Sequence, residues 1–103
     1  MPSRGEVWWG EIPDTGRRPF LILTRDAAIP VLRQLVVAPV TRTVRGIPTE
    51  LPLGTAEGMP RECAATFDNL RVIPRANLVG RICVLGPDRM VDACTALRYA
   101  VDC

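Results

Sequence analysis

The sequence of 103 residues contains no histidine and no lysine, and its only serine is Ser3. These absences exclude a Ser-His-Asp triad, a histidine acid–base pair, a Schiff-base lysine, a phosphate-loop lysine and any histidine-ligated zinc. All thirteen positive charges are therefore arginines, against eleven acidic residues, which gives a net charge of +2. This charge is too small to indicate nucleic-acid binding by itself. Any chemistry must use arginine, threonine, cysteine, tyrosine or carboxylates.

Long apolar runs are also absent. No stretch approaches the roughly 20 residues of a membrane span, and the first residues carry no signal-peptide core. We therefore expect a cytoplasmic protein that does not contact membranes. The length fits one domain over residues 1–103, and a composition of 48% hydrophobic and 23% charged residues is typical of globular proteins.

The cysteines form no Cys-x-x-Cys pair, and the acidic residues are dispersed, so no metal site is predicted. We interpret Cys63, Cys83, Cys94 and Cys103 as small buried hydrophobic residues, and we expect Cys103 to be the most exposed and reactive.

Residues that favour β-structure cluster in short segments separated by turn chemistry. Pro30 limits any helix within 26–33 to a single turn, and Pro39 suggests an edge or a bulge in its strand. The interval 13–16 is predicted as a turn and 54–61 as a loop. Strands are predicted at 5–12, 19–24, 34–41, 49–53, 62–67 and 79–85.

The period of the apolar pattern changes near the C-terminus. From Pro87 onward, Met90, Cys94, Leu97 and Val101 follow one another at spacings of four, three and four residues. This spacing predicts an α-helix with one apolar stripe, and proline suits its first position. Short strands followed by one helix predict an α+β fold that is mainly β, a small bent barrel with a C-terminal α-helix packed on it.

Four segments, in the same order, resemble the MazF/PemK family of toxin endoribonucleases from type II toxin–antitoxin systems. Arg-Gly-Glu-Val-Trp-Trp at 4–9 is similar to the start of these toxins, and Arg-Arg-Pro-Phe-Leu-Ile-Leu-Thr-Arg-Asp at 17–26 to their arginine-proline strand. Val-Ala-Pro-Val-Thr at 37–41 matches a strand that ends in a hydroxyl residue. Asp-Asn-Leu-Arg-Val-Ile at 68–73 resembles an acidic segment of the family, with Asn69 where many members have glutamine.

The resemblance implies an SH3-like barrel of the CcdB/PemK type and a homodimer. It implies a metal-independent endoribonuclease that needs no cofactor and cuts single-stranded RNA at short sequences. It also implies a cognate antitoxin whose flexible tail occupies the RNA groove. Arg18 and Thr41 match the catalytic arginine of the family and its hydroxyl partner. The turn at 13–17 is shorter than is usual, which puts the recognised sequence in doubt more than the chemistry.

The chemistry expected of such an enzyme is attack by the 2′-hydroxyl of the substrate itself, which leaves a 2′,3′-cyclic phosphate and a 5′-hydroxyl. The planar fork of Arg18 suits stabilisation of the phosphoryl oxygens, with proton donation to the leaving oxygen as a second role. A general-base role is excluded for Arg18, because a pKa near ~13 keeps it protonated. Thr41 is expected to orient the phosphate. The proton acceptor stays open among Asp68, another residue and water.

Residues around these two positions are candidates for RNA contacts. Of the two adjacent tryptophans, alternation sends Trp8 to one face of the strand and Trp9 to the other, so we expect one in the core and one at an interface. The candidate RNA-binding residues lie in the 13–17 turn, after Thr41 and near Asp68: Thr15, Gly16, Arg17, Arg42, Thr43, Arg45, Asp68, Asn69 and Arg71.

Three other functions compete with this one. A related toxin family of the same fold inhibits DNA gyrase through its terminal helix and would not need Arg18 or Thr41. A non-catalytic SH3-like module would bind proline-rich peptide on an aromatic groove, but the chain has only five aromatic residues to build one. A catalytically inactive relative that acts as a decoy is the third alternative.

Overall fold

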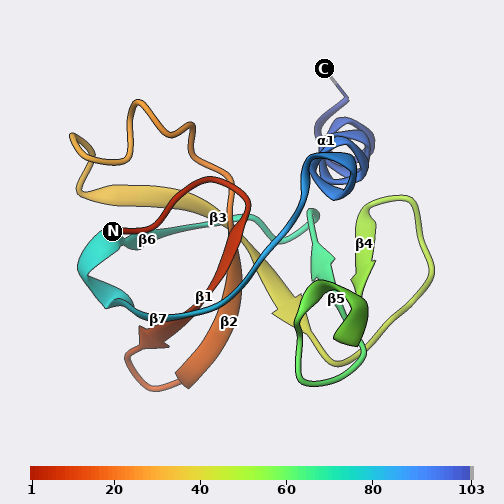
Figure 1. Cartoon of the computed structure of the whole chain (residues 1–103), viewed down its shortest axis with the longest axis horizontal. Coiled ribbons are helices and arrows are strands. Elements are labelled where there is room, and N and C mark those ends of the chain that lie inside the picture. The colour runs from red at the N-terminus through yellow and green to blue at the C-terminus, as the bar shows by residue number, and fades with distance from the viewer. Residues whose placement is uncertain (103) are drawn as a thin grey trace.

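The structure, a computed structural model, describes residues 1–102 and consists of a curled antiparallel sheet with one C-terminal helix (Figure 1). The elements are β1 (Glu6–Ile12), β2 (Gly16–Ile22), β3 (Gln34–Thr41), β4 (Glu50–Leu53), η1 (Thr55–Glu57), β5 (Cys63–Thr66), β6 (Arg71–Pro74), η2 (Arg75–Asn77), β7 (Leu78–Val84) and α1 (Pro87–Val101). The sheet has the strand order β4-β5-β3-β2-β1-β7, and β6 also pairs with β3. The predicted mainly-β barrel with a terminal helix is confirmed.

The first hairpin extends further than the sequence indicated. Strand β2 begins at Gly16 rather than at Pro19, because its pairing with β1 continues to the Ile12–Gly16 register. The turn is tight because Asp14 and Gly16 both have positive φ, at 68° and 86°, a conformation that aspartate and glycine tolerate well. As a result, Arg17 and Arg18 lie within a strand and not in a turn.

Strand β6 was not predicted. It has only four residues, it ends at Pro74, and three of the four are exposed, so it lacks the apolar signal of a buried strand. Tertiary pairing creates it, since Val36 of β3 lies opposite Val72. In the interval 54–61, predicted as a loop, the chain forms the short helix η1 and buries Met59.

The core divides into two clusters on either side of the sheet. Along β2, Phe20 and Ile22 enter one cluster and Leu21 enters the other, as the alternation of a strand requires. Strand β3 repeats this pattern with Val37 and Ala38. Both strands are therefore buried on two faces over these residues, which explains their continuous apolar runs.

Helix α1 packs on the β4 side of the sheet (Figure 1). Its buried residues are Ala93 and Ala96, whereas Val101 is 47% exposed. The predicted stripe is thus wrong at Val101, because the buried face is centred on two alanines whose apolar signal in the sequence is weak. The helix is not long and apolar enough to cross a membrane.

The cysteines follow the prediction in part. Cys63 and Cys83 are buried and Cys94 is half-buried, all three as free thiols. The prediction for Cys103 lies outside the described residues.

Candidate nucleic-acid interface

The ends of β2 and β3 bring the two predicted catalytic residues to one place. Arg18 lies opposite Gly10 in the β1–β2 register, and Thr41 is the last residue of β3. Both side chains line a single hollow of about 500 Å³, which we call the β2–β3 hollow. A volume of this size falls within the usual range of ligand pockets, about 300–1,000 Å³.

Cations dominate the polar part of this hollow. Arg17, Arg18, Arg42 and Arg61 all line it. Arg17 forms an ion pair with Glu11 at 3.6 Å, but both side chains are more than half exposed, so the pair contributes little. The guanidinium groups of Arg18, Arg42 and Arg61 have no hydrogen bond or ion pair to any residue in 1–102. Three of the four guanidinium groups of the hollow therefore present positive charge that no carboxylate in residues 1–102 pairs with.

The Thr41 hydroxyl is already oriented. Its Oγ1 donates a hydrogen bond to the carbonyl of Thr43 at 3.1 Å, which fixes the side chain where β3 ends. The donor of the hydroxyl is thereby engaged, while its lone pairs stay free to accept. A guanidinium or a substrate hydroxyl can therefore donate to Thr41. A phosphate oxygen, which only accepts, is contacted when the hydroxyl turns away from the Thr43 carbonyl.

The apolar wall of the hollow includes a tryptophan. Trp9 is half-buried and lies in the hollow beside Pro19, whereas Trp8 packs on the Phe20 cluster and donates from Nε1 to Glu6 Oε1 at 2.9 Å. The predicted division of the two tryptophans between opposite faces is what the structure has. Trp9 offers a ring surface within the same hollow as Arg18.

Sequence reasoning missed one side of the hollow. Met59, Pro60 and Arg61 from the segment between η1 and β5, with Cys63 at the start of β5, also line the hollow. No local motif marks them, because the pairing of β3 with β5 brings them there. Burial raises the pKa of the Cys63 thiol, Glu57 raises it further and Arg61 opposes both. The thiol is therefore protonated at neutral pH and a poor nucleophile.

The other candidate residues surround the hollow without lining it. Thr15 and Gly16 are exposed at the β1–β2 turn, and Thr43 and Arg45 follow β3. The backbone amides of Arg45 and Gly46 donate to Glu50 Oε1 at 2.8 and 3.2 Å, which anchors this loop to β4.

The third group of candidates lies on the connection to β6. Asp68 Oδ2 accepts a hydrogen bond from Thr49 Oγ1 at 2.6 Å, and Arg71 lies opposite Val37 of β3. Asn69 is exposed. None of the three lines the β2–β3 hollow, and their contacts with RNA stay a prediction.

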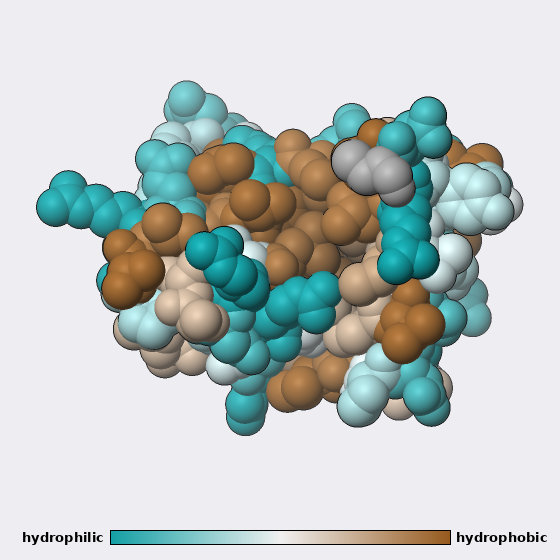
Figure 2. Space-filling model, turned by 90° about the horizontal axis from the view of Figure 1, so that it is seen from above, coloured by the Kyte–Doolittle hydropathy of each residue, from teal (hydrophilic) through white to brown (hydrophobic). Residues whose placement is uncertain are grey.

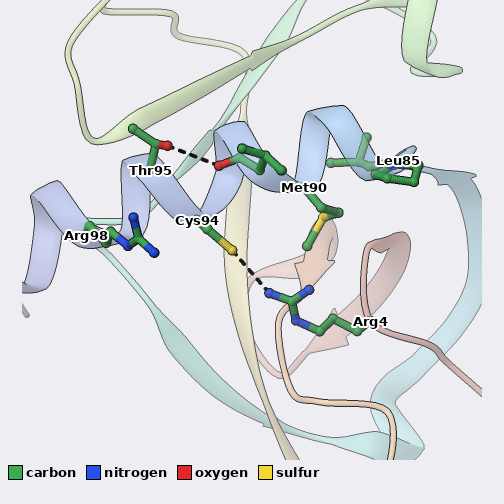
Figure 3. A pocket seen from close by; sticks show the side chains of 8 residues that line it. Arg4, Leu85, Met90, Cys94, Thr95 and Arg98 are labelled. Carbon is green, nitrogen blue, oxygen red and sulfur yellow. Dashed lines mark hydrogen bonds between the residues drawn. The ribbon is translucent and has the colours of Figure 1, made fainter.

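A second hollow of about 590 Å³ follows helix α1, lined by Leu85, Met90 and Cys94 among others (Figure 3). Arg4 reaches across it and donates from Nη2 to Cys94 Sγ at 3.4 Å. This hollow contains none of the predicted site residues. Residues 1–102 contain no group of three or more side chains that could ligate a metal.

The profile of the PemK-like, MazF-like toxins of type II toxin–antitoxin systems matches residues 3–101. The chain belongs to this family. Over 100% of its length it is 47% identical to a probable endoribonuclease MazF5 of Mycobacterium tuberculosis, of which it covers 95%. Over 97% of its length it is 41% identical to a probable endoribonuclease MazF2 of the same species, of which it covers 98%.

Solved structures give the same result for this MazF-like toxin. It superposes on the Mycobacterium tuberculosis toxin MazF-mt6 with a TM-score of 0.87 at 32% identity, covering 94% of this chain and 96% of that one. It superposes on a mycobacterial endoribonuclease, solved with its cognate antitoxin, with a TM-score of 0.89 at 25% identity and coverage of 99% and 96%. The expected enzyme class, a MazF-type toxin endoribonuclease, is thereby confirmed.

Proposed function

We propose that this MazF-like toxin cleaves single-stranded RNA at short sequences by attack of the 2′-hydroxyl, without a metal ion, and leaves 2′,3′-cyclic phosphate and 5′-hydroxyl ends. The observation that carries the proposal is the shared hollow of Arg18 and Thr41, in which the guanidinium has no partner among residues 1–102. Because the substrate supplies the nucleophile, the enzyme must only align the attack and stabilise charge.

Arg18 is the transition-state stabiliser in this proposal. Its planar fork donates two hydrogen bonds to the phosphoryl oxygens as their charge increases, and it can also protonate the leaving 5′-oxygen. Thr41 orients the phosphate from the end of β3, where its hydroxyl exchanges the Thr43 carbonyl for a phosphate oxygen as acceptor. The described lining of the hollow contains no carboxylate, and Asp68 lies outside it, which favours water over Asp68 as acceptor of the 2′-hydroxyl proton.

A cognate antitoxin would use the same surface. An acidic, flexible tail finds the cations of the hollow as favourable as RNA phosphates are, so antitoxin and RNA compete. The structural relative that was solved with its cognate antitoxin supports such a partner. An antitoxin that binds tightly and leaves cleavage unchanged would contradict the shared groove.

The proposal includes a homodimer. Apolar residues gather across the middle of one face of the molecule (Figure 2). A contiguous apolar patch of this kind marks association sites. Elsewhere on the sheet and helix, Val72, Val84, Val91 and Tyr99 each expose more than half of their surface. We expect a dimeric mass by light scattering at micromolar concentration, and a monomeric mass would count against it.

The decisive experiment is mapping of the ends that the purified protein generates on a long RNA. We expect 2′,3′-cyclic phosphate and 5′-hydroxyl ends, a block by a single 2′-deoxy substitution at the cut, and full activity in excess EDTA. Ends that carry a 5′-phosphate, or cleavage of the deoxy substrate, would contradict the mechanism. The presence of Arg18 and Thr41 in one hollow also favours the nuclease over a gyrase inhibitor, which would need neither residue.

A further inference from the structure

The segment between η1 and β5 is held firmly against the body of the protein. Gly58 ends η1 at φ +103°, and a Cβ added there would lie 2.8 Å from the Cβ of Cys83 on β7. The next residue, Met59, is 4% exposed, and its Sδ accepts a hydrogen bond from Cys83 Sγ at 3.6 Å. The backbone just before Arg61 is therefore fixed by close packing on β7.

A second set of contacts fixes the start of the segment. Glu57 Oε1 accepts a hydrogen bond from the amide of Gly54 at 2.7 Å, and its Oε2 pairs with Arg89 Nε at 3.6 Å. Arg61 leaves this anchored segment as an exposed side chain that lines the hollow together with Arg18. A cation on a fixed support, without a carboxylate partner in residues 1–102, is suited to an anionic ligand.

We propose that Arg61 is a further RNA-binding residue, which holds one of the two phosphates next to the scissile phosphate through its bidentate fork. The assignment rests on the proposed function of the hollow. Single-stranded RNA carries one phosphate per nucleotide, so a chain whose scissile phosphate lies at Arg18 places charged groups on both sides of it. Trp9 and Pro60 line the same hollow and offer apolar surface on which a base can stack.

The role differs from that of Arg18. Arg61 acts on a phosphate whose charge does not change during the reaction, so its contact stabilises the bound substrate and the transition state alike. We therefore expect Arg61→Ala to weaken RNA binding and lower kcat/KM about tenfold, with kcat at saturating RNA nearly unchanged. Arg61→Lys keeps the charge without the fork and should recover part of the loss.

The test asks whether the effect of removing the Arg61 side chain depends on the charge of one particular phosphate. The probes are non-cleavable RNA analogues with 2′-deoxy sugars at the cut and at the flanking nucleotides, in which one flanking phosphate at a time is a neutral methylphosphonate. For the wild type, neutralising the contacted phosphate should weaken binding about tenfold. For Arg61→Ala, the same substitution should have no further effect. Arg98→Ala, an exposed arginine on α1 outside the hollow, is the matched control and should behave as the wild type.

Two outcomes overturn the assignment of Arg61. One is that the losses of RNA affinity from Arg61→Ala and from each methylphosphonate multiply at both flanking positions, so that the two changes act independently. The other is that Arg61→Ala binds and cleaves as Arg98→Ala does. A wild type that binds the analogues with this coupling but does not cut RNA would refute the proposed reaction and leave the assignment of Arg61 intact. A wild type that binds no RNA would refute both.

Discussion

Arg89 on α1 and two arginines at the β2–β3 hollow are in opposite situations. Arg89 pairs with Asp92 at 2.8 Å and with Glu57 at 3.6 Å, and it also donates to the carbonyl of Pro52. In the hollow, Arg18 and Arg61 have no such partner among residues 1–102. Since lysine and histidine are absent, the chain uses one residue type for both purposes.

We interpret the difference as one between cations that stabilise the fold and cations that bind a ligand. A paired guanidinium contributes to stability through contacts that would be left unsatisfied on its removal. Unpaired guanidinium groups that converge on one hollow repel each other and raise the local positive potential, which favours an anion there. Composition could not reveal this division, because it depends on which carboxylates the fold brings near each arginine.

The largest effect is expected from Arg18→Lys, which tests whether the unpaired guanidinium of the hollow takes part in RNA cleavage. The charge is kept, but lysine cannot reproduce the two parallel hydrogen bonds to the phosphoryl oxygens. Losing such a contact costs roughly 3–4 kcal/mol, so cleavage should slow at least ~100-fold while RNA affinity changes little. Single-turnover rates at saturating protein are the measurement. Near-wild-type cleavage would show that Arg18 acts only as a surface charge and not in the reaction.

Thr41→Ala should come next. Without the hydroxyl, nothing at the end of β3 orients the phosphate in the way we propose, and cleavage should slow by about tenfold or more. Thr41→Ser keeps the hydroxyl and should stay partly active in the same single-turnover assay. Equal activity of the alanine and serine variants would show that the hydroxyl has no part in the reaction.

Most of the fold could be predicted from the sequence, because apolar periodicity reports burial. The alternation in β1 and the continuous runs in β2 and β3 correspond to strands buried on one or both faces. Strand β6 could not be predicted, since its exposed residues acquire β-structure only through pairing with β3. The orientation of α1 was missed at Val101, because Ala93 and Ala96 give a weak hydrophobic signal.

The candidate site could be predicted where it follows local motifs. Arg18 and Thr41 stand in segments that resemble the family, and the structure brings them to one hollow. Arg61 could not be found in this way, because it reaches the hollow through pairing between β3 and β5, far apart in the sequence. Long-range strand pairing, unlike a motif, leaves no signal within a short window.

A structural arginine should show the reverse pattern of effects. Arg89→Ala removes the partner of Glu57, whose side chain is only 17% exposed, and frees the Pro52 carbonyl. We expect the free energy of unfolding to fall by about 1–3 kcal/mol, measured by urea denaturation. Arg98→Ala, on the same helix, should change it much less. A loss of stability equal to that of Arg98→Ala would mean that the contacts of Arg89 are not structural.

The smallest effect concerns the pH dependence of stability at Glu6, the buried partner of Arg81. Burial alone would raise the pKa of this carboxyl, but hydrogen bonds from the Trp8 indole, the Ser3 amide and Arg81 outweigh it and hold the pKa below its ordinary value of 4.5. A carboxyl whose pKa is lower in the folded state adds stability above about pH 4.5, and this contribution is lost as the pH falls through the folded-state pKa. Glu6→Gln should therefore lower the free energy of unfolding by about 1 kcal/mol at pH 7, with the difference from the wild type shrinking at pH values below 4.5. Urea denaturation over this range measures it, and a difference that stays constant with pH would show that the charge of Glu6 does not stabilise the fold.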